Sequence, residues 1–416
     1  MGRPVTLLIV GAGSRGSGYA HFAEQFPDRV RVVGVAEPRR PYRERLVKAH
    51  DIPPEHVFSD WRDAAAVPRF ADAVIIATQD RMHVEPAVAF AELGYHMLLE
   101  KPMAPDAEGC YKIVDAVKRS GILFGVCHVL RYTQYTQKLK HLIDSGAIGD
   151  IVGIDRLEPV GFWHMAHSFV RGNWRNESES GPMLLTKSCH DLDWIYYIMG
   201  SKPWTAVSSF GSLKHFRPEE APPGAAERCL DCPIEADCPY SAKRIYLEVL
   251  RRGYTGWPVD VLTPDPTPES VLDALRTGPY GRCVYHCDND VVDHQVVAME
   301  FEGGGTATFT MMAFTRMRHR ETRIFGTRGE LTGDGRYIHY YSFATDKTQT
   351  IDTQASDPSI IGGHGGGDYH LMDHFIRAVA ENNPQWILSG PDETLASHLM
   401  VFAAERARRE GRIIRP

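Results

Sequence analysis

The 416-residue chain has no long hydrophobic run and no excess of basic charge. Its apolar stretches fall well short of the ~18–20 residues that a membrane-spanning helix needs, so we expect no membrane partner. The formal net charge is −7 at pH 7, which disfavours binding to nucleic acid. The N-terminus leads directly into a predicted strand without a signal-peptide pattern, so we expect a cytoplasmic protein.

Cysteine is scarce as well, with eight residues that are unevenly distributed. In a cytoplasmic protein these thiols stay reduced, so their clustering needs an explanation other than a disulfide framework. Apolar residues make up 43% of the chain and charged residues 24%, which is ordinary for a globular protein. A chain of this length is typical of two domains.

A glycine-rich turn follows an apolar run over residues 7–10 and precedes a predicted helix over residues 17–26. Three glycines in G-x-G-x-x-G spacing permit a tight turn, a close approach to a pyrophosphate, and packing of helix on strand. The helix N-terminus adds free N–H groups and a positive dipole end. The predicted phosphate-binding residues are Gly11, Gly13, Ser14, Arg15 and Gly16.

An acidic residue, Glu37, ends a second apolar strand over residues 31–36. An acid about 20 residues beyond such glycines is placed to bind a ribose 2′-hydroxyl. Its charge repels the 2′-phosphate of NADP, so the sequence predicts NAD as the cofactor. Arg39 and Arg40 are residues that accommodate that phosphate, and they keep NADP open as an alternative.

Strands and helices alternate as far as about residue 127, which predicts an α/β fold with a Rossmann-type, doubly wound parallel sheet. Further strands are expected over 57–58, 73–77, 96–99 and 123–126, and helices over 39–49, 82–93 and 107–120. Ligands bind outside the carboxyl ends of such strands. The residues near those ends that we expect to contact the cofactor are Thr78, His83, Glu100, Lys101 and His128.

The pattern changes after a predicted helix over residues 135–145. Loosely alternating stretches over 151–157, 291–301, 306–314, 322–325 and 337–343 predict an open, mostly antiparallel sheet, with a hairpin loop at 303–305. Late helices are expected over 368–380 and 392–409. We therefore predict a dinucleotide-binding domain over residues 1–130 and an α/β substrate domain over 131–416, with a cysteine-rich insert at about 217–287.

The fifth predicted strand ends in Glu100-Lys101-Pro102. A Rossmann half with this ending resembles the Gfo/Idh/MocA family of glucose–fructose oxidoreductase and inositol dehydrogenase. The resemblance implies NAD as cofactor, a carbohydrate substrate, and Lys101 beside the nicotinamide and the reacting hydroxyl. It also implies a second domain that covers the cofactor with one face and forms homo-oligomers, dimers or tetramers, with the other. We expect Pro102 to follow a cis peptide bond.

A glycine-led, helix-like segment over residues 181–194 contains the second predicted catalytic group. Lys187, His190 and Asp191 recur there at spacings that share a helix face. The family carries a catalytic histidine in this place, and His190 matches it. Its role would be to take or return the proton of the hydroxyl being oxidised, with Asp191 or a neighbour orienting the ring.

One position departs from the family pattern. Members similar to inositol dehydrogenase place an aspartate four residues before the histidine, whereas this chain has Thr186 there, with Lys187 beside it. We include Lys187 among the predicted catalytic residues. Its positive charge would favour binding of an anionic substrate or stabilise a developing oxyanion.

Aromatic and cationic residues are concentrated over residues 162–175. Aromatic faces stack on sugar rings, and arginine binds carboxylate, phosphate or sulfonate groups. A packed surface loop is the alternative. The predicted substrate-binding residues are Arg131, Trp163, His164, Arg171, Trp174, Arg175 and Lys187. A glycine-rich loop over 362–368 is either a further anion site or a linker in which Asp368 caps a helix.

The cysteine-rich insert carries a C-x-x-C pair followed by further cysteines, a spacing that predicts a structural zinc site. The predicted ligands are Cys229, Cys232, Cys238 and Cys287, with Cys283 as the alternative fourth ligand. Because a proline follows Cys238, an iron–sulfur cluster is an alternative to zinc. Cysteines that bind no metal are the other alternative. We expect Cys110, Cys127 and Cys189 to be packing residues.

Three functions follow from these features. The cysteine insert, the Gly-Ala-Gly-Ser-Arg-Gly turn and the Thr-Lys-Ser-Cys-His-Asp segment are together similar to the NAD-dependent glycoside hydrolases of the family, including those that act on sulfoquinovosides. That resemblance implies hydride removal at sugar C3, elimination, water addition and re-reduction, without flanking carboxylates. The alternative is a plain NAD-dependent sugar or polyol dehydrogenase of the inositol type. A non-catalytic NAD-sensing protein is disfavoured by the presence of both Lys101 and His190.

Overall fold

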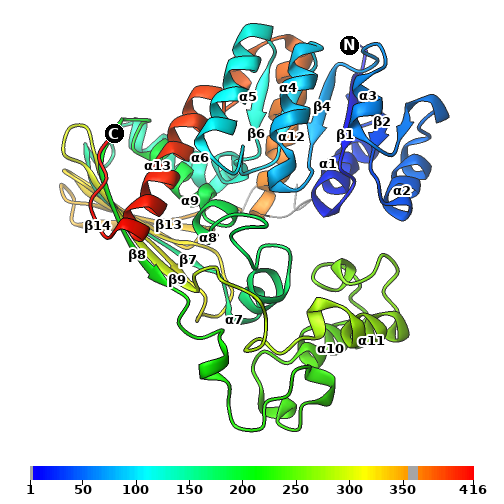
Figure 1. The fold of residues 1–416 in the computed structure, drawn as a ribbon. Coiled ribbons are helices and arrows are strands. Elements are labelled where there is room, and N and C mark those ends of the chain that lie inside the picture. Colours follow the sequence, from blue (N-terminus) through cyan, green and yellow to red (C-terminus); the bar gives the residue numbers. More distant parts are fainter. Residues whose placement is uncertain (1–2, 355–363) are drawn as a thin grey trace.

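A computed structural model describes residues 3–354 and 364–416 (Figure 1). Two sheets organise these residues, and a lobe built from the insert, green in Figure 1, projects below them. No helix among the described residues has the length and apolar character needed to cross a membrane. The domain boundary at residue 130 stays a prediction.

The first sheet has six parallel strands in the order β3-β2-β1-β4-β5-β6, which confirms the predicted doubly wound fold. Its strands are β1 (Val5–Val10), β2 (Val30–Ala36), β3 (Val57–Phe58), β4 (Ala73–Ile76), β5 (His96–Leu99) and β6 (Phe124–Val126). Their helices are α1 (Ser14–Gln25), α2 (Arg40–His50), α3 (Trp61–Ala65), α4 (Val84–Glu92) and α5 (Ala107–Ser120). Leu7, Leu8 and Ile9 are fully buried because helices cover both faces of a sheet of this kind. Strand order reverses between β1 and β4, where dinucleotides bind in such sheets.

The second sheet has eight strands in the order β14-β13-β12-β11-β7-β10-β9-β8. Its strands are β7 (Ile151–Pro159), β8 (Trp204–Ser212), β9 (His294–Phe301), β10 (Thr306–Met312), β11 (Glu321–Gly326), β12 (Gly329–Gly333), β13 (Tyr337–Ser342) and β14 (Lys347–Asp352). All neighbours are antiparallel except β7 and β10. The mostly antiparallel sheet and the hairpin through residues 303–305 are confirmed, while β8, β12 and β14 are additional to the prediction.

The helix expected over residues 181–194 is instead interrupted. α8 (Met183–Thr186) ends before Lys187, and α9 (Cys189–Ile198) begins after Ser188. Lys187 therefore does not share a continuous helix with His190, which corrects the predicted common face. The remaining segments that carry predicted site residues or adjoin them are η2 (Asp80–Met82), η3 (Val129–Tyr132), α6 (Gln134–Asp144), α7 (Phe162–Met165) and η4 (Ala166–Arg171).

The last two helices pack back against earlier parts of the chain, as Figure 1 shows. α12 (Gly367–Glu381) places Leu371 and Phe375 in a hydrophobic cluster with Tyr19 and Phe22 of α1. α13 (Pro391–Glu410) contacts α5, α9 and β8, so it touches elements of both sheets. The C-terminal helices thereby join the two halves of the molecule.

The insert lies between β8 and β9 and consists mainly of short helical turns. These are η5 (Pro218–Glu220), η6 (Cys229–Asp231), η7 (Glu235–Asp237), η8 (Lys243–Leu247), α10 (Glu248–Arg251), η9 (Val259–Val261), α11 (Pro268–Thr277) and η10 (Pro279–Gly281). Thr267 and Ser270 form a capping box that begins α11.

A buried ion pair connects η3 with α9 and α13. Arg131 donates from Nε and Nη2 to the two carboxylate oxygens of Asp193, each at 2.7 Å, and both side chains are 1% exposed. Ser397 of α13 donates to the same carboxylate at 2.9 Å. Removing one partner would leave the other charge buried and uncompensated.

We expect Arg131→Met to lower the free energy of unfolding by about 3–5 kcal/mol, because Asp193 loses its counter-charge. The double variant Arg131→Met/Asp193→Leu should lose clearly less, since no buried charge is left unpaired. Urea unfolding followed by circular dichroism measures both, with exposed Arg119→Met as the matched control. Equal losses in the single and double variants would contradict this role of the pair.

Candidate active site

The glycine-rich turn has the geometry that a dinucleotide requires. Gly11 has φ +89°, and a Cβ there would lie 2.6 Å from the carbonyl oxygen of Ala77. A Cβ at Gly16 would lie 1.9 Å from the carbonyl oxygen of Gly11, so α1 packs on the turn only without a side chain there. The N-terminus of α1 has no side-chain cap and no acid in its first turn, which leaves its amides available to a phosphate.

Glu37 lies at this turn, as predicted. Its buried carboxylate accepts hydrogen bonds from the Ala12 amide at 2.8 Å and from the Arg39 guanidinium at 2.8 and 2.9 Å. Burial opposes the charged form, but the hydrogen bonds from Arg39 and Ala12 outweigh it and lower the pKa of Glu37. Arg39 is thus bound to the acid, an arrangement that fits NAD better than NADP.

Lys101 follows β5 and is held by the buried carboxylate of Glu100. One oxygen of Glu100 accepts from Arg15 Nε and from the Tyr19 hydroxyl, each at 2.6 Å. The other accepts from the Lys101 amide at 2.9 Å. The Lys101 ammonium donates to the carbonyl oxygen of Thr186 at 2.7 Å, and the Lys101–Pro102 peptide bond is cis as expected.

The contact between Arg15 and Glu100 therefore links the glycine-rich turn to Lys101. Arg15 also pairs with Asp368 of α12 at 2.6 Å, so its guanidinium joins the turn to the end of the chain. Both oxygens of Glu100 already have partners, which makes it a residue that positions Lys101.

His190 lies on α9 near Lys101 and is 5% exposed. Burial, together with the charge of Lys101, holds the pKa of His190 well below its usual value, so the imidazole is neutral and able to accept a proton. Its Nδ1 is buried and has no hydrogen-bond partner in the described part of the chain. Its ring centroid lies 5.8 Å from that of His128 and 6.0 Å from that of His364.

Asp191 does not orient the His190 ring, which corrects that prediction. Its carboxylate accepts from Arg156 Nε at 2.8 Å and from Arg320 Nε at 2.9 Å. Two guanidinium groups compensate its burial more fully than a neutral imidazole would. Asp191 therefore anchors cations beside the site.

Cations gather around α9. Arg320 bridges Asp191 and Glu158, with its Nε 2.7 Å from a Glu158 oxygen, and Lys187 lies 3.4 Å from Glu158. Burial lowers the pKa of Lys187. With Arg156, this group has three cations and the two carboxylates of Asp191 and Glu158. Sequence reasoning missed Arg320, although the cationic run over residues 316–320 was a visible signal.

Trp163 and His164 reach the same region. The pKa of His164 is lowered well below its usual value by burial and then by the nearby Lys187. Both rings contact Trp257 of the insert, with centroids 5.2 and 5.0 Å away. Trp257 was missed, because nothing in the sequence around it signals that the insert reaches back to residue 163.

Trp174 is also brought toward the site, through Asp80, which sequence reasoning missed as well. Its Nε1 donates to Asp80 Oδ2 at 3.1 Å. Burial raises the pKa of Asp80, which lies near Lys101 and His83. Asp80 follows β4 and so occupies a strand end of the kind at which such sites form.

Several predicted ligand-binding residues are too deeply buried to contact a ligand. The residues concerned, each at most 1% exposed, are His83, His128, Arg131 and Arg171. His83 lies 2.8 Å from the Pro102 carbonyl and 3.2 Å from that of Thr78, so it fixes two strand ends together. Burial lowers the pKa of His128 to about 3, and its ring separates His190 from His398. The predicted contacts of all four are corrected; Thr78 keeps partial exposure.

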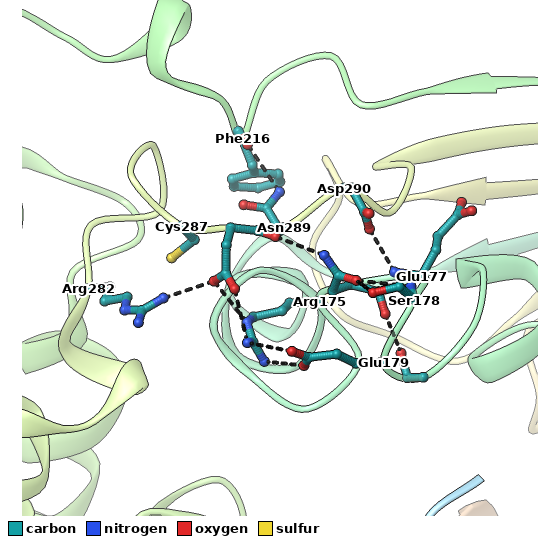
Figure 2. Close-up of polar contacts among 12 residues, drawn as sticks. Arg175, Glu177, Ser178, Glu179, Phe216, Arg282, Cys287, Asn289 and Asp290 are labelled. Carbon is teal, nitrogen blue, oxygen red and sulfur yellow. Dashed lines mark hydrogen bonds and ion pairs between the residues drawn. The ribbon is translucent and has the colours of Figure 1, made fainter. Parts of the chain in front are cut away.

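Arg175 belongs to a different cluster (Figure 2). It donates to Asp288 from Nε at 2.9 Å and from Nη2 at 3.0 Å, and it pairs with Glu179 at 3.0 Å. Arg282 donates to the same aspartate at 2.8 Å. Arg175 therefore fastens the end of the insert to residues 176–180, which corrects its assignment to substrate binding.

The cysteines of the insert surround a small cavity of about 20 Å³. Its cysteine lining is Cys229, Cys232, Cys238 and Cys283, so the alternative fourth residue lies there in place of Cys287. As they stand, no three His, Cys, Asp or Glu side chains of residues 3–354 and 364–416 form a group that could hold a metal ion. As placed, these side chains therefore do not form the predicted zinc site. Cys110, Cys127 and Cys189 are buried packing residues, as expected.

The glycine-rich loop before α12 is described only from His364 onward; Gly362 and Gly363 lie outside the described residues. Asp368 does not cap α12, which begins after Gly366 without a side-chain cap. Its carboxylate lies 3.1 Å from His364 Nδ1 and 2.6 Å from Arg15. This corrects the linker interpretation.

Relatives among known proteins share parts of this chain. The oxidoreductase YteT of Bacillus subtilis is 24% identical over 329 residues, which is 73% of this chain and 71% of that protein. The 2,7-anhydro-N-acetylneuraminate hydratase of Escherichia coli is 30% identical over 156 residues, 38% of this chain and 41% of the enzyme. An inositol 2-dehydrogenase of Streptomyces avermitilis is 32% identical over 211 residues, 50% of this chain and 57% of the enzyme.

The fold is shared with solved structures over nearly the full chain. Levoglucosan dehydrogenase in complex with NADH and levoglucosan superposes with a TM-score of 0.71 at 19% identity, covering 99% of both chains. Two family models match in sequence, "Oxidoreductase family, NAD-binding Rossmann fold" over residues 5–128 and "Oxidoreductase family, C-terminal alpha/beta domain" over residues 140–415. Because these matches span most of its length, the chain belongs to the Gfo/Idh/MocA oxidoreductase family and is an enzyme of that NAD-binding family.

Proposed function

We propose that the protein is an NAD-dependent carbohydrate-active enzyme that hydrolyses glycosides without net oxidation. The observation that carries NAD-dependent chemistry on a sugar hydroxyl is the proximity of Lys101 to the neutral imidazole of His190, at the carboxyl edge of the first sheet. Relatives named for sugar dehydrogenation and for hydration of an anhydro sugar support a carbohydrate substrate. A hydratase among them supports water addition as chemistry that this fold performs.

Lys101 and His190 have different roles in the proposed reaction. NAD, when bound at the Gly11–Gly16 turn and Glu37, supplies the hydride acceptor and donor. Lys101 places its ammonium where a sugar oxygen gains negative charge, and Glu100 fixes the backbone of that lysine. His190 accepts the proton of the C3 hydroxyl, since its imidazole is neutral, and later returns it. The ketone then acidifies the neighbouring C2–H bond, which permits elimination and water addition.

We also propose an anionic glycoside, such as a sulfoquinovoside, as the substrate. Lys187 and Arg320 lie near His164, and together with Arg156 these three cations exceed the carboxylates of Glu158 and Asp191 by one charge. A carboxylate, phosphate or sulfonate on the sugar would complete this group.

The second candidate is a plain sugar or polyol dehydrogenase. The same lysine and histidine serve it, and the inositol 2-dehydrogenase relative favours it. The two candidates differ in outcome, because a dehydrogenase accumulates NADH whereas the hydrolase returns its hydride. A cytoplasmic location and a homo-oligomer remain predictions; Phe210 and Val296, 71% and 41% exposed on the outer strands, are the side chains that support an oligomer contact.

A structural metal in the insert is a separate proposal. Arg171 supports it, because this 1%-exposed guanidinium pairs with no carboxylate among the described residues and donates to Cys229 Sγ at 3.3 Å. A buried cation needs an anionic partner, which a metal-bound thiolate cluster supplies. The thiols around the cavity would have to move together to coordinate the ion.

Purified protein with NAD⁺ and nitrophenyl glycosides, including the sulfoquinovoside and glucuronide, should release nitrophenol without net NADH. Lys101→Ala or His190→Ala should lower this release by about 10²–10⁴-fold, since proton transfer and oxyanion stabilisation are lost. NADH binding, measured by fluorescence, should persist in both. Exposed His21→Ala is the control. NADH accumulation from free sugars without nitrophenol release would replace the hydrolase by the dehydrogenase.

For Lys187→Gln we expect a rise in KM of about 10-fold or more for the sulfoquinovoside and little change for the neutral glucoside, because a charge-assisted hydrogen bond is lost. Exposed Lys202→Gln is the matched control. Equal effects on the KM of both substrates would show that Lys187 does not bind the anionic group of the sugar.

Elemental analysis of intact protein should find about one zinc or iron per chain. Cys283→Ser should abolish this metal content, whereas Cys287→Ser should retain it, because Cys283 lines the cavity. Protein free of both metals, purified without chelators, would remove the metal from this proposal.

A further inference from the structure

We propose that His364 is a second catalytic base of the active site, which removes the C2 proton of the oxidised sugar. This inference rests on the proposed glycoside hydrolysis, which needs a base at C2, whereas plain dehydrogenation needs none. His364 precedes α12, far along the chain from Lys101 and His190, and its side chain is 35% exposed. It therefore reaches the site from the C-terminal end of the protein while remaining open to a ligand.

The hydrogen bonds of His364 fix which nitrogen accepts the proton. Its Nδ1 lies 3.1 Å from Asp368 Oδ2. Although burial opposes the charge of Asp368, Arg15 and His364 hold the pKa of that carboxyl far below its usual range, so Asp368 is a carboxylate and must accept. Nδ1 is thus the donor, and Nε2 is left with a free lone pair.

The backbone of His364 has an unusual conformation. His364 has φ +57°, a left-handed value that non-glycine residues adopt rarely, and Gly365 and Gly366 follow with φ +63° and +85°. Residues held in such conformations are concentrated at functional sites. Asp368 is in turn fixed by Arg15 on the cofactor turn, at 2.6 and 3.2 Å. The position of His364 is therefore tied to the place where NAD binds.

The separation of the two histidines suits neighbouring positions of one sugar ring. The centroids of His190 and His364 are 6.0 Å apart, with 48° between the ring planes. His190 accepts the proton of the C3 hydroxyl, and His364 Nε2 accepts the proton on C2. The ammonium of Lys101 and the guanidinium of Arg320 also lie near His190, but they are donors without an acceptor and cannot replace His364 in this step.

The step balances without a further reactant. The C2–H electron pair forms the C1=C2 double bond, the C1–O bond breaks, and its electrons leave with the aglycone oxygen, which is nitrophenolate for the test substrates. Water then adds its oxygen to C1. The His364 imidazolium returns the proton to C2, and the remaining proton of that water balances the leaving alkoxide or phenolate.

The test uses the whole NAD-loaded protein and the nitrophenyl sulfoquinovoside. In His364→Asn, nitrophenol release should fall by about 10²-fold or more. Oxidation at C3 should persist, so a burst of NADH of up to one equivalent per active site is expected. In D2O, wild-type protein should place deuterium at C2 of the released sugar. The variant, assayed on the free sugar, should lose this exchange while its NADH burst stays within about threefold.

Two further variants control the result. His339→Asn removes another exposed histidine, one that contacts Thr350 on a neighbouring strand, and should behave as wild type. Asp368→Asn should lower C2 exchange, because the amide no longer fixes the Nδ1–H tautomer. Wild-type nitrophenol release and C2 exchange in His364→Asn would overturn the role of His364 and leave the hydrolase intact. A wild-type protein that releases no nitrophenol and only accumulates NADH would overturn the proposed function itself.

Discussion

The buried carboxylate of Glu100 is the contact on which the site depends. It binds Arg15 of the cofactor turn, the Tyr19 hydroxyl and the Lys101 amide at the same time, and Arg15 continues to Asp368 of α12. Burial alone would disfavour this charge, yet the pKa of Glu100 is lowered because Arg15 and Lys101 more than compensate. A buried network of this kind stabilises only when every member is satisfied. The turn, the lysine and the last part of the chain must therefore assemble together.

Most elements of the fold could be predicted from local sequence patterns. The helix over 107–120 has the bounds expected from its sequence, because Asp106 caps it and Gly121 ends it in a left-handed conformation. The glycine turn, Glu37 and the Glu-Lys-Pro ending were equally readable, since each acts through near neighbours. Strand β14 was not, because Lys347–Asp352 is polar and mostly exposed and shows no hydrophobic alternation.

The errors in the site have a common physical cause. An arginine in an aromatic loop has the same appearance in a sequence whether it binds a ligand or a buried partner. Arg131 and Arg171 proved to be interior cations, while Arg320, one of several cations in its run, joined the site through Asp191. Trp257 and Asp80 were missed for the related reason that long-range packing decides where a loop residue points. Periodicity reports which face of an element is buried, not which distant segment covers it.

The position of β7 in the second sheet has a consequence for folding during synthesis. β7 lies between β10 and β11, both of which follow the whole insert in sequence, so its two edges stay unpaired until the insert has been synthesised. Contacts of such long sequence separation form slowly, and unpaired strand edges invite association with other chains. We therefore expect the nascent protein to hold an exposed β7 for much of translation, the interval in which a chaperone would have most to protect.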